Sequence, residues 1–254
     1  MTQEERRLYL IRYLLEEGGY SAEVPTAADD QKKLLRALMN VRAPGEASPT
    51  FLAVQDDYLA AATAAKGITD AATLPYREDM TVWQGDITTL KADAIVNAAN
   101  SALLGCFVPG HHCIDNAIHT FAGIQLRLAC DAMMRRQGAE EPTGRAKITE
   151  GYNLPCRYVL HTVGPIVQGR PTPQNAADLA SCYTECLALA DRYHLGSVAF
   201  CCISTGVFGY PNREAAEVAV EAVRRYKRTT GSTIKVIFNV WKDIDYAIYH
   251  RLLD

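Results

Sequence analysis

The sequence predicts an α/β sandwich preceded by a small helical segment, and two patterns together with the chain length support this fold class. From Met80 onward, short apolar runs alternate with longer amphipathic runs, as strands and helices do in α/β domains. Residues 1–75 show helical spacing only. With 254 residues, 48% apolar and 22% charged, the chain suits one main domain with an accessory segment. We therefore expect a helical extension over residues 1–76 and an α/β domain over residues 77–254.

Three helices are predicted in the extension. Apolar residues at helical spacing from Leu8 to Leu15 predict the first, and Gly18 with Gly19 ends it. Asp29 or Asp30 is a suitable cap for a second helix, which ends near Pro44. Ser48 followed by Pro49 predicts the start of a third helix, because serine caps helices and proline is favoured at the first helical position. This helix runs to about Ala65.

The α/β part contains six predicted strands and four predicted helices, and no internal repeat is visible. The strands are Met80–Gln84, Ala94–Ala98, Lys147–Gly151, Tyr158–Val163, Ser197–Cys202 and Ile234–Val240. The helices are Asp115–Gln137, Gln174–Tyr193, Asn212–Thr229 and Ile244–Leu253.

Charge and hydropathy exclude two classes of partner. Residues 1–76 carry 8 basic and 11 acidic side chains, and residues 77–254 carry 18 of each, so the positive surplus that nucleic-acid binding usually needs is missing. No run of about 18 apolar residues is present, and the N-terminus does not resemble a signal peptide. We expect a soluble, cytoplasmic protein with neither a nucleic-acid nor a membrane partner. A monomer is expected.

Eight cysteines in a chain expected to be intracellular indicate thiols or metal ligands rather than disulfides. Four of them lie in apolar patterns and are expected in the core: Cys182, Cys186, Cys201 and Cys202. Cys106 and Cys113 differ, because they share a short, aperiodic stretch with His111 and His112. One loop can direct both thiolates and one of the two histidines at a single ion. Zinc is the expected metal, since it prefers sulfur and nitrogen ligands.

Two further loops follow predicted strands, and ligands of open α/β sheets bind beyond the carboxyl ends of strands. In the segment 85–88, Asp86 can accept a hydrogen bond from an amino group, or it can simply cap a turn. The segment Ser204–Pro211 has two glycines and two aromatic residues before a helix. Its backbone amides can cradle a pyrophosphate, or the segment can be only a tight turn.

Four motifs in succession resemble those of macrodomains, the family that binds and processes ADP-ribose. They are Asn97–Asn100, Asp115–Gly123, Thr149–Pro165 and Ser204–Pro211. The resemblance covers about residues 78–254 and implies a three-layer α/β/α sandwich with a mixed central sheet. The insertion in the segment Gly105–Asp115 resembles the zinc-dependent macrodomain subgroup, as does the helical extension. In that subgroup's pattern the metal ligands fall on Cys106, His111 and Cys113, with one Zn²⁺ per chain.

The resemblance also implies roles for individual residues. Asn100 would hold the distal ribose, and Asp115 would position or activate water, so both are the expected catalytic residues; helix capping is an alternative role for Asp115. His119 and His161 are expected to be scaffold residues. The remaining contacts are Asp86 with the adenine amino group, Ile87 beside it, Asn239 near the adenosine, and Ser204, Thr205, Gly206, Val207 and Phe208 around the diphosphate and ribose.

The leading hypothesis is therefore a zinc-dependent hydrolase that removes mono-ADP-ribose from acidic side chains of modified proteins. The alternative is an ADP-ribose reader in which a structural zinc only shapes the loop. Three protein ligands leave a fourth zinc position free, which favours a catalytic ion over a structural one. A thiol redox protein using Cys106 and Cys113 is less favoured, because no Cys-x-x-Cys pair is present.

Overall fold

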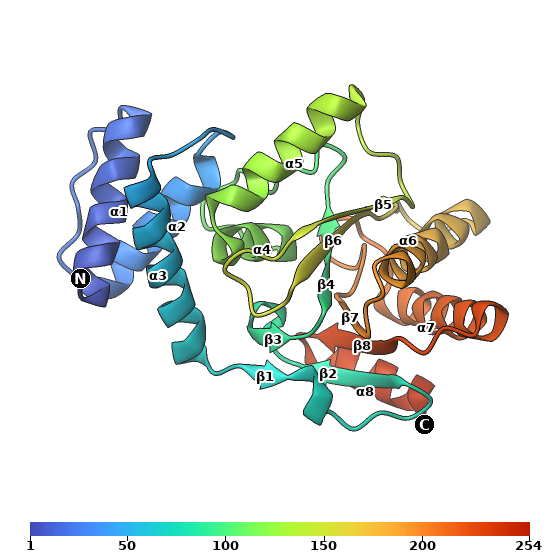
Figure 1. Ribbon diagram of the computed structural model, residues 1–254. Coiled ribbons are helices and arrows are strands. Elements are labelled where there is room, and N and C mark those ends of the chain that lie inside the picture. Colours follow the sequence, from blue (N-terminus) through green and yellow to red (C-terminus); the bar gives the residue numbers. More distant parts are fainter.

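The computed structural model describes residues 1–254, and its N-terminal part is the helical extension that the sequence predicts. It comprises α1 (Gln3–Gly18), α2 (Ala28–Val41) and α3 (Pro49–Lys66). In Figure 1 these blue helices stand at one side of the molecule, next to α4. Their apolar faces form a separate core that includes Leu14, Leu38 and Phe51 and is closed by Ile124 of the α/β part. None of the protein's helices is long and apolar enough to cross a membrane.

The ends of these helices follow simple capping rules, with one exception. Ser48 accepts the backbone N–H of Phe51 at 3.1 Å and Pro49 is the first residue of α3, as predicted. The prediction that Asp29 or Asp30 caps α2 is wrong. Ala27 occupies the cap, and both aspartates lie in the first turn, where their negative charge is favourable near the helix N-terminus.

The central sheet has six strands in the order β2-β8-β7-β4-β6-β5. All neighbouring pairs are parallel except β5 with β6, so the sheet is mixed. The bounds are β2 (Met80–Gln84), β4 (Ala94–Ala99), β5 (Ala146–Glu150), β6 (Tyr158–Val163), β7 (Ser197–Phe200) and β8 (Lys235–Val240). Two additional two-residue strands that the sequence did not predict, β1 (Thr69–Asp70) and β3 (Leu90–Lys91), pair in parallel with each other.

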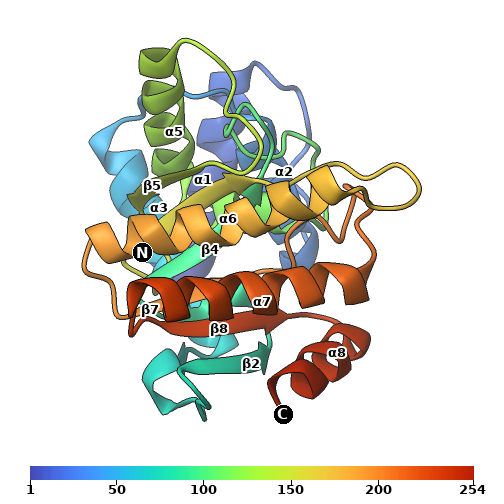
Figure 2. The same cartoon turned by 90° about the vertical axis from the view of Figure 1, so that its right-hand side faces the viewer.

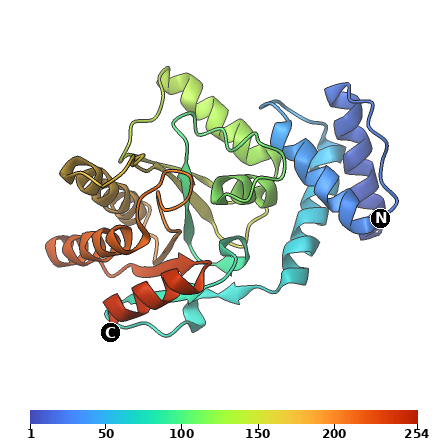
Figure 3. The ribbon, with the colours of Figure 1, turned by 180° about the vertical axis from the view of Figure 1, so that it is seen from behind.

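Helices cover both faces of the sheet. On one face lie α6 (Pro173–Arg192), α7 (Asn212–Thr230) and α8 (Asp243–Leu253), which stand in front of the strands in Figure 2. On the other face lie α4 (Ile114–Ala122) and α5 (Ile124–Gln137), with the extension outside them, as Figure 3 shows from behind. The expected three-layer α/β/α sandwich with a mixed sheet is therefore confirmed.

The single helix predicted over residues 115–137 is in fact two helices, α4 and α5. Gly123 separates them with a φ of 95°, a conformation that side chains disfavour. A Cβ atom there would also lie 2.7 Å from the amide nitrogen of Gln55 in α3. The side-chain oxygen of Gln55 accepts the backbone N–H of Ile124 at 3.0 Å. The extension thus contributes a cap for α5, which a local sequence pattern cannot indicate.

Candidate active site

Five parallel strands end at one edge of the sheet, and the predicted site residues follow them there. Asp86 comes after β2, residues 100–113 after β4, and residues 201–211 after β7. The strand register places Ala99 beside Val163 and Gln84 beside Val240, so the loops after these strands emerge at the same edge. The sheet therefore gathers segments that lie far apart in the sequence, as α/β sheets do at ligand sites.

The loop of residues 104–113, here called the metal loop, brings its predicted ligands together. The ligand atoms of Cys106, His111 and Cys113 all lie within 4.8 Å of one another, and the three side chains are half-buried. Cys106 Sγ is 3.5 Å from His111 Nδ1. His112 is exposed and lies outside this group.

The donor set of this group suits zinc, which binds two sulfurs and an imidazole nitrogen well. Burial, helped by the neighbouring Cys106 and Asp115 and opposed by the hydrogen bond from the Asn116 N–H, raises the pKa of the Cys113 thiol to about 11. A divalent cation would offset this effect, because metal binding favours the thiolate.

Asp115 lies in the first turn of α4 and is 5% exposed. Its Oδ1 atom accepts a hydrogen bond from the side-chain amide of Asn97 at 2.8 Å, and its Oδ2 atom lies 3.5 Å from the amide nitrogen of Asn100. Burial raises the pKa of Asp115 to about 6, opposed by the Asn97 hydrogen bond and the charge of Arg127. Asp115 does not cap α4; Cys113 does, by accepting the N–H of Asn116 at 3.4 Å.

Two buried histidines stand behind the Asp115 carboxylate. His161 Nδ1 is 3.2 Å from the Asn97 amide nitrogen, and its Nε2 is 2.9 Å from the Thr149 hydroxyl. His119 Nε2 is 3.6 Å from Asp115 Oδ1, and neither of its ring nitrogens has a hydrogen-bond partner. Burial lowers the pKa of His161 to about 4 and that of His119 well below its usual value, so both rings are neutral at pH 7.

The adenine side of the predicted site contains a contact that the sequence did not indicate. Asp86 caps a short 3-10 helix by accepting the Thr88 N–H at 3.0 Å, and its Oδ2 pairs with Lys66 at 2.9 Å. Burial opposes ionisation of Asp86, but the hydrogen bonds from Thr88 and Lys66 outweigh it and lower its pKa. Lys66 is the last residue of α3, so the extension reaches this side of the site. Its ammonium also lies 3.2 Å from the centre of the Phe121 ring.

The two other residues expected near the adenosine are engaged in the fold. Ile87 is 1% exposed, and its side chain belongs to the main core. The Asn239 side-chain amide donates to the carbonyl of Gly85 at 2.9 Å. Asn239 therefore holds the turn that presents Asp86.

The segment after β7, which is predicted to bind the diphosphate, forms an open backbone loop. Ser204 has a φ of 65° and its carbonyl accepts the Tyr210 N–H at 2.9 Å, which closes the loop. The backbone N–H groups of Gly206, Val207 and Phe208 donate to no protein acceptor. Val207 is 80% exposed. Consecutive free amides of this kind are a favourable place for a phosphate group.

Several residues that contact the predicted site residues or the metal loop were not predicted from the sequence. Asn97 belongs to a motif that was recognised, but no role was assigned to it. Arg36, Asn40 and Lys66 come from the extension, and Arg127 comes from α5. Their partners lie 20 to 88 residues away in the chain, so no local spacing could reveal them.

An α/β/α sandwich with a mixed sheet and these loops at the carboxyl edge is the macrodomain fold. The family model described as "Macro domain" matches residues 96–219. A protein-ADP-ribose hydrolase from Treponema medium is 53% identical over 260 residues, covering 100% of both chains. A protein-ADP-ribose hydrolase from Staphylococcus aureus (strain MSSA476) is 52% identical over 229 residues, covering 89% of this chain and 86% of the relative.

A solved macrodomain structure has the same fold. The Trypanosoma brucei macrodomain in complex with ADP-ribose superposes with a TM-score of 0.66 at 28% identity, covering 86% of this chain and 95% of that one. The chain belongs to the macro domain family.

Proposed function

We propose that the protein is a hydrolase that removes mono-ADP-ribose from aspartate and glutamate side chains of modified proteins, with a zinc ion held by Cys106, His111 and Cys113. Two relatives above 50% identity carry the name protein-ADP-ribose hydrolase, which supports the reaction class. The observation that carries the proposal is the gathering of three ligand atoms within 4.8 Å in the loop that leads directly into the buried Asp115.

ADP-ribose would be bound by polar groups at the carboxyl edge of the sheet that can form further hydrogen bonds. Asp86 would accept the adenine amino group, since its side chain is 33% exposed. The free amides of Gly206, Val207 and Phe208 would bind the diphosphate. Asn100 would hold the distal ribose, and it lies between the metal loop and Asp115: its amide donates to the Gly105 carbonyl at 3.1 Å.

Catalysis would depend on Asp115. Its carboxylate is held by Asn97 and has Asn100 close by, so it is placed to orient a water molecule. Attack of this water breaks the bond between ADP-ribose and the carboxyl group, releasing free ADP-ribose and the unmodified acidic side chain. A zinc ion bound by the metal loop would supply Lewis-acid chemistry.

The test is turnover by the purified protein on a substrate carrying ester-linked mono-ADP-ribose, with and without a chelator. Cys106→Ala is compared with wild type for both ADP-ribose affinity and hydrolysis rate. A large loss of rate, with affinity changed by less than about tenfold, supports a catalytic metal. Equal losses in rate and affinity would instead indicate a structural zinc.

Two further results address the substrate. ADP-ribose binding without any hydrolysis would make the protein a reader. A substrate modified on serine should remain intact while one modified on glutamate is hydrolysed. Equal hydrolysis of both would contradict the proposed preference for acidic side chains.

A further inference from the structure

The metal loop depends on its surroundings for its shape. No helix or strand lies between the end of β4 and the start of α4. Within residues 104–113 the backbone makes a single internal hydrogen bond, from the His111 N–H to the Val108 carbonyl at 3.2 Å. Gly110 has a φ of 64° and nothing lies near the position of a Cβ atom there. Such a segment samples many conformations unless other parts of the protein hold it.

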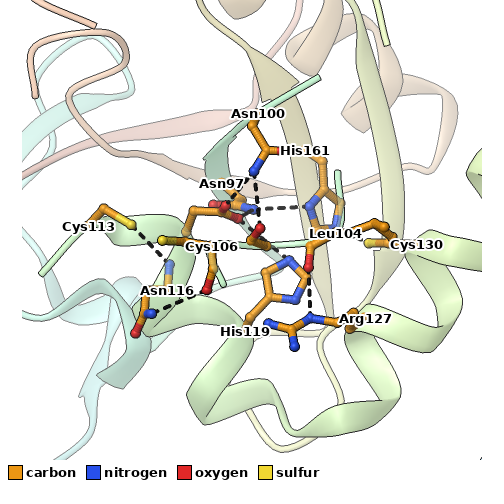
Figure 4. Close-up of polar contacts among 12 residues, drawn as sticks. Asn97, Asn100, Leu104, Cys106, Cys113, Asn116, His119, Arg127, Cys130 and His161 are labelled. Atoms are coloured by element: carbon orange, nitrogen blue, oxygen red, sulfur yellow. Dashed lines mark hydrogen bonds and ion pairs between the residues drawn. The ribbon is translucent and has the colours of Figure 1, made fainter. Parts of the chain in front are cut away.

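Arg36 of α2 holds the second half of the loop. Its guanidinium donates to the His111 carbonyl at 3.0 Å and twice to Asn116 Oδ1, at 2.8 and 3.1 Å. The amide nitrogen of Asn116 in turn contacts the carbonyl of Val108 at 3.1 Å. It also contacts the carbonyl of Cys106 at 3.4 Å (Figure 4). Asn116 is fully buried. Arg36 thereby holds the backbone of His111 directly and that of Cys106 through Asn116.

Asn40, one turn further along α2, holds the tip of the loop. Its Oδ1 atom accepts the Gly110 N–H at 3.0 Å, and its amide nitrogen donates to the Thr120 hydroxyl at 3.0 Å. Asn40 is 1% exposed. The same side chain therefore ties the residue before His111 to α4.

The first half of the loop is held through Arg127 of α5. Its Nε donates to the Leu104 carbonyl at 2.7 Å, and its Nη1 donates to the carbonyls of Met39 and Asn40 at the end of α2. The guanidinium also lies 4.2 Å from the centre of the Phe107 ring. A positive charge at a helix C-terminus is favourable, so this bridge joins α2 and the loop stably.

We propose that α2 of the N-terminal extension is the positioning element of the metal site, and that Arg36 and Asn40 hold the metal loop in the shape that gathers Cys106, His111 and Cys113. Both act through the loop backbone and touch no ligand atom. Preorganisation of this kind raises affinity, because ordering of the loop no longer opposes binding. The inference rests on the proposed zinc site, but the ordering of the loop can be measured without any metal.

The first measurement is hydrogen–deuterium exchange of residues 104–113 in the metal-free full-length protein. Arg36→Met and Asn40→Ala should accelerate exchange there, whereas Arg6→Met should not. Arg6 is the matched control, because it pairs with Asp57 inside the extension at 2.7 Å. Arg36→Lys keeps the positive charge but loses the several N–H donors of the planar guanidinium. Its exchange rate should lie between those of wild type and Arg36→Met. Thermal unfolding of all variants separates a loosened loop from a loosened extension.

The second measurement is zinc affinity by competition with a coloured chelator. Arg36→Met and Asn40→Ala should each weaken zinc binding by at least about tenfold, and Arg6→Met should leave it unchanged. Exchange rates and zinc affinity equal to those of wild type in both variants would overturn the proposal. If wild type binds no zinc, the metal in the proposed function is wrong, and the exchange rates alone decide whether α2 orders the loop.

Discussion

The side-chain amide of Asn97 donates a hydrogen bond of 2.8 Å to the buried carboxylate of Asp115, and its nitrogen lies 3.2 Å from His161 Nδ1. Asn97 is on β4, Asp115 on α4 and His161 on β6, so one amide joins three elements. Both donor hydrogens of the amide are used in this way. Asn97 therefore ties the carboxylate to the sheet, as a group that positions water requires.

Replacing Asn97 by alanine should lower kcat at least about tenfold with little change in KM, because Asp115 loses its orientation but the binding loops remain. Removing a hydrogen-bond donor from a buried carboxylate should also cost about 1 to 3 kcal/mol of unfolding free energy. Asn212→Ala is the control, since Asn212 donates to Asp245 between α7 and α8. It should reduce stability but not kcat. Similar hydrolysis rates in the two variants would exclude a role for Asn97 in positioning.

Zinc should copurify at about one ion per chain, given the two sulfurs and one imidazole nitrogen of the metal loop. Alanine at Cys106, His111 or Cys113 should remove the metal, whereas His112→Ala should retain it, because His112 is exposed and outside the group. Metal analysis of the purified proteins checks this. If His111→Ala retained zinc and His112→Ala lost it, His112 rather than His111 would be the metal ligand.

Asp86→Ala should weaken ADP-ribose binding by roughly tenfold or more, since a hydrogen bond to a charged group contributes about 1.5 to 3 kcal/mol. Asp70→Ala is a close match, because Asp70 also caps a 3-10 helix and pairs with a lysine at 2.9 Å. It should leave the affinity unchanged. Calorimetric titration with free ADP-ribose measures both, and equal affinities in the two variants would make Asp86 only a turn residue.

The buried His161 should make stability depend on pH. Its pKa is about 4 in the folded protein and near 6.5 when unfolded, because burial disfavours the imidazolium. Between these values the unfolded chain binds more protons, so the unfolding free energy decreases as the pH falls from about 6.5 to 4. Below pH 4 the total decrease in the free energy of unfolding should be about 3 kcal/mol.

Urea unfolding of wild type and His161→Gln across this pH range isolates the effect. Asp115 acts in the opposite sense, since its raised pKa stabilises the folded protein as the pH falls, but it is present in both proteins. His119 and Cys130 also face His161, from α4 and α5, and are likewise unchanged. A difference between the two proteins that stays constant with pH would contradict a neutral, buried His161.

Much of the fold could be predicted, because the strands and most helices follow local periodicity. The strand bounds agree with the predictions to within one residue, except that β7 ends at Phe200 rather than Cys202. The break between α4 and α5 was not predicted, because it depends on Gly123 and on a cap from Gln55 in another helix. β1 and β3 have only two residues each, too few for a pattern.

The candidate site could be predicted where its residues are contiguous. Cys106, His111 and Cys113 lie in one short loop, and the structure brings them together. The partners of Asp115 and Asp86 could not be predicted, because Asn97 and Lys66 reach them through packing. Asn97 lies in a recognised motif, but the motif alone does not indicate its hydrogen bond to Asp115. Lys66 lies at the end of a helix, where a lysine is common, so its pairing with Asp86 could not be predicted.

The long-range contacts of the extension have a consequence for how the chain folds as it is synthesised. The side chains of Arg36, Asn40 and Gln55 are synthesised before their partners in the α/β part, which follow 69 to 80 residues later. Until α4 and α5 emerge, these side chains lack their hydrogen-bond partners and the small helical core lacks Ile124. We therefore expect the first 76 residues not to fold by themselves. They should instead fold only after α4 and α5 have been synthesised, together with these helices.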